Sequence, residues 1–407
     1  MHALFLFLVL ATPAAQAAGP AEPAAFDIAS MLEACKQLPI QQQRACVEPY
    51  LDDLPEQIAE GLRFETDPDI QAASKQWKEA IDAALRAQAE ALAARGGARN
   101  LLAAALLWPL PEPAEGEQWP VRSPQAEAWF AAARAAVPGD PLVAWMEASD
   151  CGGLTDECLG DEAISRLLEV DPDNAAVHLL ALHPALQRGD DAASVLHLRE
   201  AASADAYQTG FPELLRLIVD AHEGIAWPEP GPELGEALAA MWGISAPVTA
   251  EDFASVQAFG RTMAVTYTGL RPLTEICPDD GGGNADLRDE CMAVYALAAR
   301  RSDALVDRLI ALVHLSRLTA GDASGDPWRE QLRQIYWVQA RGYALLPGSP
   351  ASGITGGEYL RLYVEKGELG ALQDVMQRHG SPTEPPTGWL PAEPRQRALV
   401  TTGVPPG

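Results

Sequence analysis

The chain has 407 residues, of which 48% are hydrophobic, and this content is enough for a sizeable core. Its 57 acidic and 29 basic residues give a formal net charge of −28 at pH 7. A surface of this sign repels nucleic acids and anionic lipids, so neither is expected as a partner.

The first residues predict a cleaved secretory signal at 1–17. Residues 4–10 form an unbroken apolar run, and an Ala-Gln-Ala triplet follows at 15–17, although no Lys or Arg precedes the run. The run is far below the roughly 20 residues that span a bilayer. We therefore expect a periplasmic or secreted protein without membrane insertion. A retained anchor or a disordered tail is the alternative for this segment.

The cysteine pattern predicts three disulfides. An even number of cysteines in an exported chain is typical of disulfide bonding, and the six fall into three close pairs. Sequential pairing closes the shortest loops, so we expect Cys35–Cys46, Cys151–Cys158 and Cys277–Cys291. No pair has Cys-x-x-Cys spacing or a neighbouring His at ligand spacing, so no metal is expected there.

Helical periodicity runs along most of the chain, and no convincing run of alternating β-branched residues occurs. Residues 69–95 predict one long Ala-rich helix. Thr249, with Asp252 three residues later, resembles a capping box that opens a helix. Residues 302–319 predict a central, mostly buried helix, and 327–345 predict a helix with one apolar face. The predicted fold class is all-α.

Proline and glycine mark the expected breaks between domains. A loop is expected at 109–124. The segment 227–247 contains Trp-Pro-Glu-Pro-Gly-Pro and is the expected boundary between helical domains at 18–226 and 248–380. Residues 381–407 are rich in Pro, Gly and Thr, and we expect them to form an irregular tail.

One internal repeat carries a resemblance to a known family. A small residue, a large apolar residue, a small or apolar residue and a helix stop recur every 34 residues, starting at Ala126, Gly160 and Ser194. A helix–turn–helix unit of 34 residues is the period of tetratricopeptide repeats, and residues 98–206 resemble that family. The resemblance implies an α-solenoid of antiparallel helix pairs, tetratricopeptide-like in the middle. A generic helical bundle with coincidental spacing is the alternative.

In such a solenoid, the first helices of successive pairs line a concave surface that binds peptides or partner helices. Trp145 and Ser149 share a face of one first helix, and the same face of the next carries His183, Leu186 and Gln187. We expect these five residues to line a shared groove. His183 and Gln187 should be partly exposed, because a buried His or Gln needs hydrogen-bond partners. Simple packing against the helix around residue 180 is the alternative for Trp145.

The sequence contains no catalytic signature. Gly-x-Ser-x-Gly and His-Glu-x-x-His are both missing, and no cofactor is expected. Asp303, Asp307 and His314 form a polar stripe that would permit general-base chemistry, although a structural role is commoner for such a stripe. The leading interpretation is an exported, non-catalytic protein-interaction scaffold that binds a protein or peptide. A polysaccharide-active enzyme on an all-helical toroid is the alternative, and its carboxylates would come from distant helices.

Overall fold

The computed structural model describes residues 42, 46, 48, 61, 63–111, 122–150, 160–242, 244, 247–264, 270–277, 285–346 and 354–404. Within these residues all regular elements are helices, and the one isolated β-bridge joins Asn174 to Ala206. The predicted all-α class is therefore confirmed, whereas the solenoid arrangement stays a prediction. The predicted signal at 1–17 lies outside the described residues.

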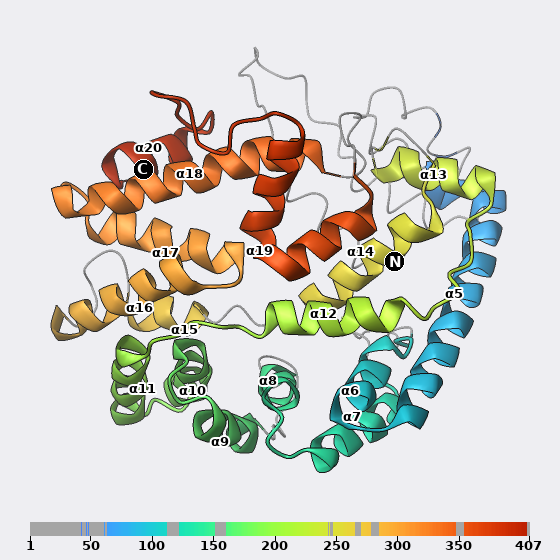
Figure 1. Cartoon of the computed structure of the whole chain (residues 1–407), viewed down its shortest axis with the longest axis horizontal. Helices are drawn as coiled ribbons and strands as arrows, with labels where there is room; N and C mark the ends of the chain where they lie inside the picture. The colour runs from blue at the N-terminus through green and yellow to red at the C-terminus, as the bar shows by residue number, and fades with distance from the viewer. Residues whose placement is uncertain are drawn as a thin grey trace. The chain divides into compact units, whose positions relative to one another are not determined.

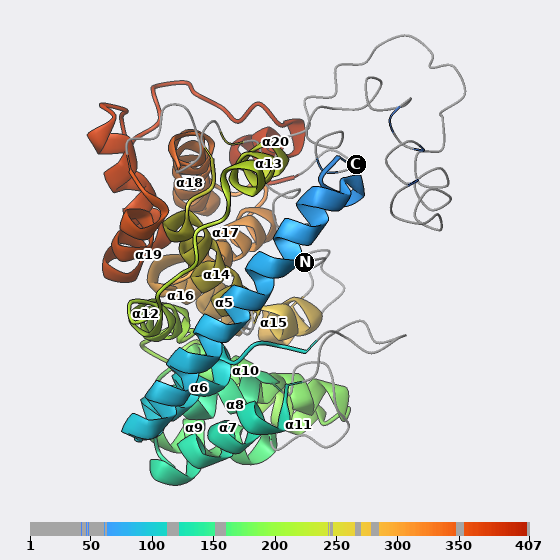
Figure 2. The ribbon, with the colours of Figure 1, turned by 90° about the vertical axis from the view of Figure 1, so that its right-hand side faces the viewer.

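Among the described helices the longest is α5, which Figure 2 shows as one continuous rod. No helix in the described part of the chain is long and apolar enough to cross a membrane. In chain order the α-helices are α5 (Pro68–Arg95), α6 (Ala98–Leu107), α7 (Pro124–Ala136), α8 (Pro141–Asp150), α9 (Gly160–Val170), α10 (Ala175–Gln187), α11 (Asp191–Ser203), α12 (Phe211–His222), α13 (Pro232–Trp242), α14 (Ala250–Ala264), α15 (Arg271–Ile276), α16 (Arg288–Arg301), α17 (Leu305–Leu318), α18 (Asp326–Gly342), α19 (Gly356–Arg378) and α20 (Pro394–Thr402). Short 3-10 helices are η2 (Ala285–Leu287), η3 (Ala323–Gly325) and η4 (Tyr343–Leu345).

The chain divides into two compact units. Unit 1 contains residues 1–84, 226–254 and 348–352, and unit 2 contains residues 85–225, 255–347 and 353–407. The segment 227–247, predicted as a boundary between halves, thus lies within unit 1. The helices of the predicted repeat share unit 2 with the C-terminal helices.

Unit 1 has a small core of its own. Trp77 on α5 packs against Phe253 with ring centroids 4.5 Å apart, and its indole N–H donates to the Pro228 carbonyl at 2.8 Å. The predicted capping box is confirmed at the start of α14. The Thr249 hydroxyl donates to Asp252 at 2.7 Å and accepts from the Asp252 backbone N–H at 3.1 Å.

In unit 2, helices that follow one another in sequence pack together. The packed pairs are α6 with α7, α8 with α9, α10 with α11, α16 with α17, and α17 with α18 (Figure 1). The pairs α8/α9 and α10/α11 lie where the repeat predicts helix pairs. Helix α11 also packs on α16, and α10 packs on α15, so these pairs and the C-terminal helices share one core.

Residues 204–210, which we call the return segment, connect α11 to α12 along the start of α10. The Ala175 N–H donates to the Ala206 carbonyl at 2.9 Å. The Asn174 side chain donates to the Gln208 carbonyl at 2.9 Å and accepts from the Gln208 N–H at 3.0 Å. Tyr207 of this segment is fully buried in the core of unit 2. The return segment is therefore an ordered part of the fold.

The tail was expected to be irregular, but part of it forms helix α20. The carboxylate of Glu393 caps the helix by accepting two backbone N–H groups of the first turn, at 2.9 and 2.6 Å. Gly403 ends the helix with φ 79°, a left-handed conformation that favours glycine. Leu399 and Val400 are buried in the core of unit 2. Capping and tertiary burial thus stabilise a helix in a segment whose proline, glycine and threonine content favours irregular structure.

One predicted disulfide lies in the described part of the chain. Cys277 at the end of α15 and Cys291 on α16 are bonded, with their Cα atoms 5.9 Å apart. Cys35, Cys151 and Cys158 lie outside the described residues, so the other two pairings stay predictions.

Candidate functional site

The predicted groove residues lie on α8 and α10, but they differ in exposure. Trp145 is only 5% exposed and belongs to the core of unit 2. Ser149, His183 and Leu186 are half-buried, and Gln187 is exposed. Trp145 is therefore a core residue, whereas the shared groove of the five residues stays a prediction.

The return segment explains the burial of Trp145. Gly210 lies against the indole ring, and a Cβ placed on Gly210 would be 3.5 Å from the ring atoms Cγ and Cδ1. Gly210 has φ 70°, a conformation that favours a residue without a side chain. The repeat pattern does not predict this connection between helix pairs, because it describes the helices and not the segments that cover them.

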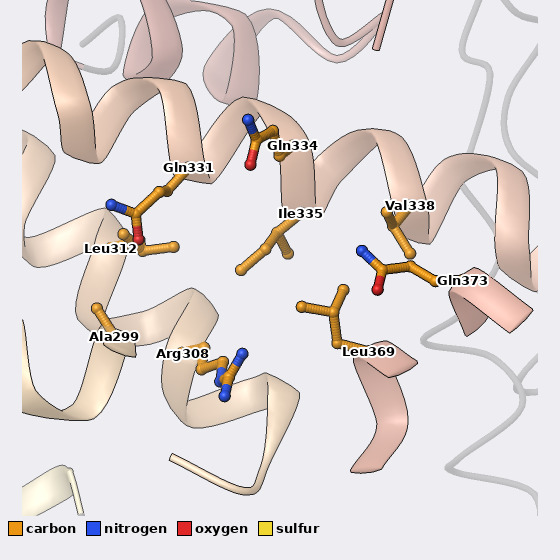
Figure 3. Close-up of a pocket in the computed structure, with 9 residues that line it drawn as sticks. All are labelled: Ala299, Arg308, Leu312, Gln331, Gln334, Ile335, Val338, Leu369 and Gln373. Atoms are coloured by element: carbon orange, nitrogen blue, oxygen red, sulfur yellow. The ribbon is translucent and has the colours of Figure 1, made fainter. Parts of the chain in front are cut away.

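A cavity of about 200 Å³ lies between α16, α17, α18 and α19, all within unit 2 (Figure 3). Its lining combines a guanidinium group and three side-chain amides with five apolar side chains. These residues are Arg308, Gln331, Gln334, Gln373, Ala299, Leu312, Ile335, Val338 and Leu369.

Helical spacing places the lining residues. Eight of the nine form four pairs of one polar and one apolar residue, four positions apart on the same helix. The pairs are Arg308 with Leu312, Gln331 with Ile335, Gln334 with Val338, and Leu369 with Gln373. Residues four apart share one face of a helix, so each pair presents both groups to the cavity. Sequence reasoning missed this site because the pairs lie on three helices whose contact cannot be read from their spacing.

The cavity has an apolar floor and more exposed polar groups. Ile335, Val338 and Leu312 are buried, whereas Gln334 is exposed and Gln331 is half-buried. Figure 3 shows the polar side chains arranged around the central Ile335. The arrangement can accept an apolar group at the floor and hydrogen-bonding groups above it.

Arg308 carries the one charge in the lining. Its Nε donates to the Ser302 carbonyl at 2.6 Å. Burial lowers the pKa of Arg308, and the nearby carboxylate of Asp303 opposes that shift. The charge of Arg308 is therefore partly offset by a neighbour, and the cavity does not present an isolated cation to a ligand.

The C-terminal region that holds the cavity is electrically balanced. Residues 288–407 contain 13 acidic and 13 basic side chains, so the net charge of −28 lies entirely in residues 1–287. The cavity is therefore suited to a neutral ligand, in contrast to the acidic remainder of the chain.

Two acids lie one turn apart at the start of α17. Asp303 accepts from the Thr209 hydroxyl at 2.8 Å and from the Thr209 N–H at 3.3 Å. Asp307 is 1% exposed and accepts from the Tyr207 hydroxyl at 3.4 Å. Burial raises the pKa of Asp307 to about 7, the charge of Asp303 adds to the shift, and the Tyr207 hydrogen bond opposes it. Burial also raises the pKa of Asp303.

A third perturbed acid, Glu368, lies where α19 is interrupted. Gly367 has φ 70° and ψ 171°, and Figure 1 shows α19 as two segments meeting at an angle. The hydroxyl of Tyr343 donates to Glu368 at 2.6 Å, and that of Tyr363 donates at 3.3 Å. Burial raises the pKa of Glu368, and the two hydrogen bonds oppose the shift. The interruption sets the direction of the second half of α19, which carries Leu369 into the cavity wall.

The predicted polar stripe on α17 has separate partners. His314 stacks on Tyr295 of α16, with ring centroids 4.8 Å apart and planes 3° apart. Asp307 interacts instead with Tyr207 of the return segment. These contacts favour the structural role for His314.

Known proteins do not assign this site. Comparisons with protein-family models, with curated proteins and with solved structures find no match to the chain. Among the described residues, no group of three or more His, Cys, Asp or Glu side chains is placed to hold a metal ion. The function must therefore be inferred from the chemistry of the cavity itself.

Proposed function

We propose that this chain is an exported, non-catalytic protein-interaction scaffold whose cavity takes one apolar side chain of a peptide or protein partner. The supporting observation is the lining of the cavity, with buried apolar groups at the floor and amides around them. The tetratricopeptide-like helix pairs belong to the same proposal, because stacked helix pairs commonly present peptide-binding surfaces.

The size of the cavity supports a side chain as its occupant. Pockets that enclose whole small molecules occupy roughly 300–1,000 Å³. The present cavity, at about 200 Å³, is smaller than that range. It therefore suits a group such as a Leu, Ile or Met side chain that enters from a larger partner.

The polar groups suit a peptide main chain. A glutamine amide can both donate and accept hydrogen bonds, as a peptide group does, and three glutamines surround the floor. Arg308 adds donors for a carbonyl oxygen, while Asp303 offsets its charge. These groups favour a neutral peptide segment over an anion.

The enzyme alternative receives less support from this cavity. Glycoside hydrolysis commonly uses a pair of carboxyl groups that flank the bond to be cleaved. The cavity has no carboxylate among its described lining residues. The scaffold is therefore the better account of this site.

Export is supported by the predicted signal and by the Cys277–Cys291 bond, since disulfides persist in oxidising compartments. The direct test is selection of random linear peptides displayed on phage against the mature chain. Leu369→Trp fills the cavity, and Leu390→Trp is the matched control, because Leu390 is exposed and does not line the cavity.

We expect the unmodified protein and Leu390→Trp to retain the same peptides, and Leu369→Trp not to retain them. The retained peptides should share one apolar residue and carry no excess negative charge. Retention of the same peptides by Leu369→Trp would place their binding elsewhere. No enrichment on the unmodified protein would also refute the proposal.

A further inference from the structure

The return segment is attached to α17 through two acids. Tyr207 contacts Asp307, and Thr209 contacts Asp303 through both its hydroxyl and its backbone N–H. Tyr207 and Asp307 are both buried, so water does not readily replace these bonds. The Oδ1 atom of Asp307 has no hydrogen-bond partner among the described residues. The contact of the return segment with α17 therefore includes one incompletely satisfied carboxyl group.

Few charges act on Asp307 among the described residues. Asp303 acts on it from the residues just before α17, and Tyr207 faces it from the return segment. Arg308, on the same helix, interacts with Asp303. From α19, the backbone at Gly367 approaches the carbonyl oxygen of Asp303, and a Cβ there would lie 3.6 Å from it. Among the described residues, burial, the charge of Asp303 and the Tyr207 hydroxyl set the pKa of Asp307, and no ionisable side chain of α16, α18 or α20 contributes to it.

The buried Asp307 and the half-buried Asp303 ionise together only at a cost, because burial and mutual repulsion both oppose the second charge. Asp303 is the better stabilised of the two, since Thr209 donates twice to it and Arg308 lies nearby. The second charge therefore falls on Asp307, whose hydrogen bond from Tyr207 is long at 3.4 Å. Moving the return segment away would let water reach this carboxylate.

We infer that Asp307 is a proton-controlled latch, which holds the return segment on α17 when it is neutral and releases the segment when it ionises. Release also uncovers Trp145, because Gly210 of the return segment lies against the indole ring. The latch thus controls access to the face of α8 that carries Trp145. It does not depend on the function proposed for the cavity.

Proton linkage gives the size of the effect. The carboxyl group of Asp307 has a pKa of about 7 in the closed form and returns toward its ordinary value of 3.8 when hydrated. For that difference, linkage predicts that the population of the open form rises about tenfold between pH 6 and pH 8. Asp307→Asn carries no titratable group and removes this dependence.

Amide hydrogen exchange of the return segment tests the latch in the full chain. Protection factors for residues 204–210, corrected for intrinsic exchange rates, are compared at pH 6 and pH 8. We expect an about tenfold loss of protection in the unmodified protein at pH 8. Asp307→Asn should show equal protection at both values. The matched control Asp220→Asn, an exposed position on α12, should behave like the unmodified protein.

Three outcomes would overturn the inference. The first is equal protection of residues 204–210 at pH 6 and pH 8 in the unmodified protein. The second is the same pH dependence of this protection in Asp307→Asn. The third is an equal loss of protection in α18, which would indicate global unfolding. Tyr207→Phe is a second variant for the case in which Asp307→Asn does not fold. Tyr207→Phe removes a hydrogen bond that favours the ionised form of Asp307. The loss of protection of residues 204–210 at pH 8 should therefore be larger in this variant than in the unmodified protein. An unchanged loss would contradict the latch.

Discussion

Tyr207 and Asp307 are 100 residues apart in sequence, yet the tyrosine hydroxyl lies 3.4 Å from Oδ2 of the aspartate. This contact joins the return segment to α17 and so links the helices of the predicted repeat to the C-terminal helices within unit 2. The burial of Asp307 makes the contact dependent on pH, because the neutral acid is the form favoured in the core.

Asp307→Asn should stabilise the protein more at pH 8 than at pH 5. The pKa of Asp307 is raised to about 7 in the folded state from 3.8, so its contribution to stability falls as pH rises between these values. We expect the gain in free energy of unfolding to be about 2.5 kcal/mol larger at pH 8. Urea unfolding at both pH values measures this difference.

Asp220→Asn is the control for that experiment, since it makes the same chemical change at an exposed position. It should alter the free energy of unfolding by no more than about 0.5 kcal/mol at either pH. An effect of Asp307→Asn that is equal at pH 5 and pH 8 would show that the acid does not titrate in the core as described.

Trp145→Ala should destabilise the protein strongly, whereas Gln187→Ala should not. Truncation of a buried Trp removes apolar contacts and leaves a cavity, at a cost of about 3–5 kcal/mol. Gln187 is exposed, and its truncation should cost no more than about 0.5 kcal/mol. Urea unfolding compares the two variants, and equal, small effects would contradict the burial of Trp145 beneath Gly210.

The sequence predicted those elements that depend on local interactions. The capping box of Thr249 and Asp252 was visible because both partners lie within one turn. The helices at 302–319 and 327–345 were visible because their apolar faces have the helical period. Both kinds of signal are contained in short stretches of chain.

Features that depend on distant contacts were not predictable in this way. The burial of Trp145 depends on Gly210, and the cavity forms where four separate helices meet. Helix α20 forms in a segment rich in proline and glycine because its apolar residues enter the core. The sequence therefore indicated the polar stripe of Asp303, Asp307 and His314, but neither its partners nor the cavity.

Gly403→Ala should release α20 from the core. A Cβ at this position would overlap the Ser316 carbonyl oxygen and lie 3.2 Å from Cα of Ala320. Gly388→Ala is the matched control, because Gly388 also has positive φ, at 77°, but no atom lies within 4 Å of its Cβ position. Limited proteolysis should cut the C-terminal segment faster in Gly403→Ala only. Equal cutting in both variants would indicate backbone strain rather than the close approach to Ser316.

Removal of the Cys277–Cys291 bond should weaken the fold moderately. The bond closes a sequence separation of 14 residues, and loops of this size contribute roughly 3 kcal/mol in the chain-entropy account. The double variant Cys277→Ser/Cys291→Ser should lose stability of that order in urea unfolding. A loss close to zero would mean that strain or residual structure cancels the effect.

The central claim is that the cavity between α16, α17, α18 and α19 takes one apolar side chain from a partner, and a binding cycle tests it most directly. A selected peptide and its version with alanine at the apolar position are titrated by calorimetry against the unmodified protein and Leu369→Trp. Burial of one such side chain contributes about 1.5–3 kcal/mol, so the alanine peptide should bind the unmodified protein at least about tenfold more weakly. The account predicts that Leu369→Trp binds both peptides equally weakly. An unchanged dissociation constant of the selected peptide for Leu369→Trp would contradict it.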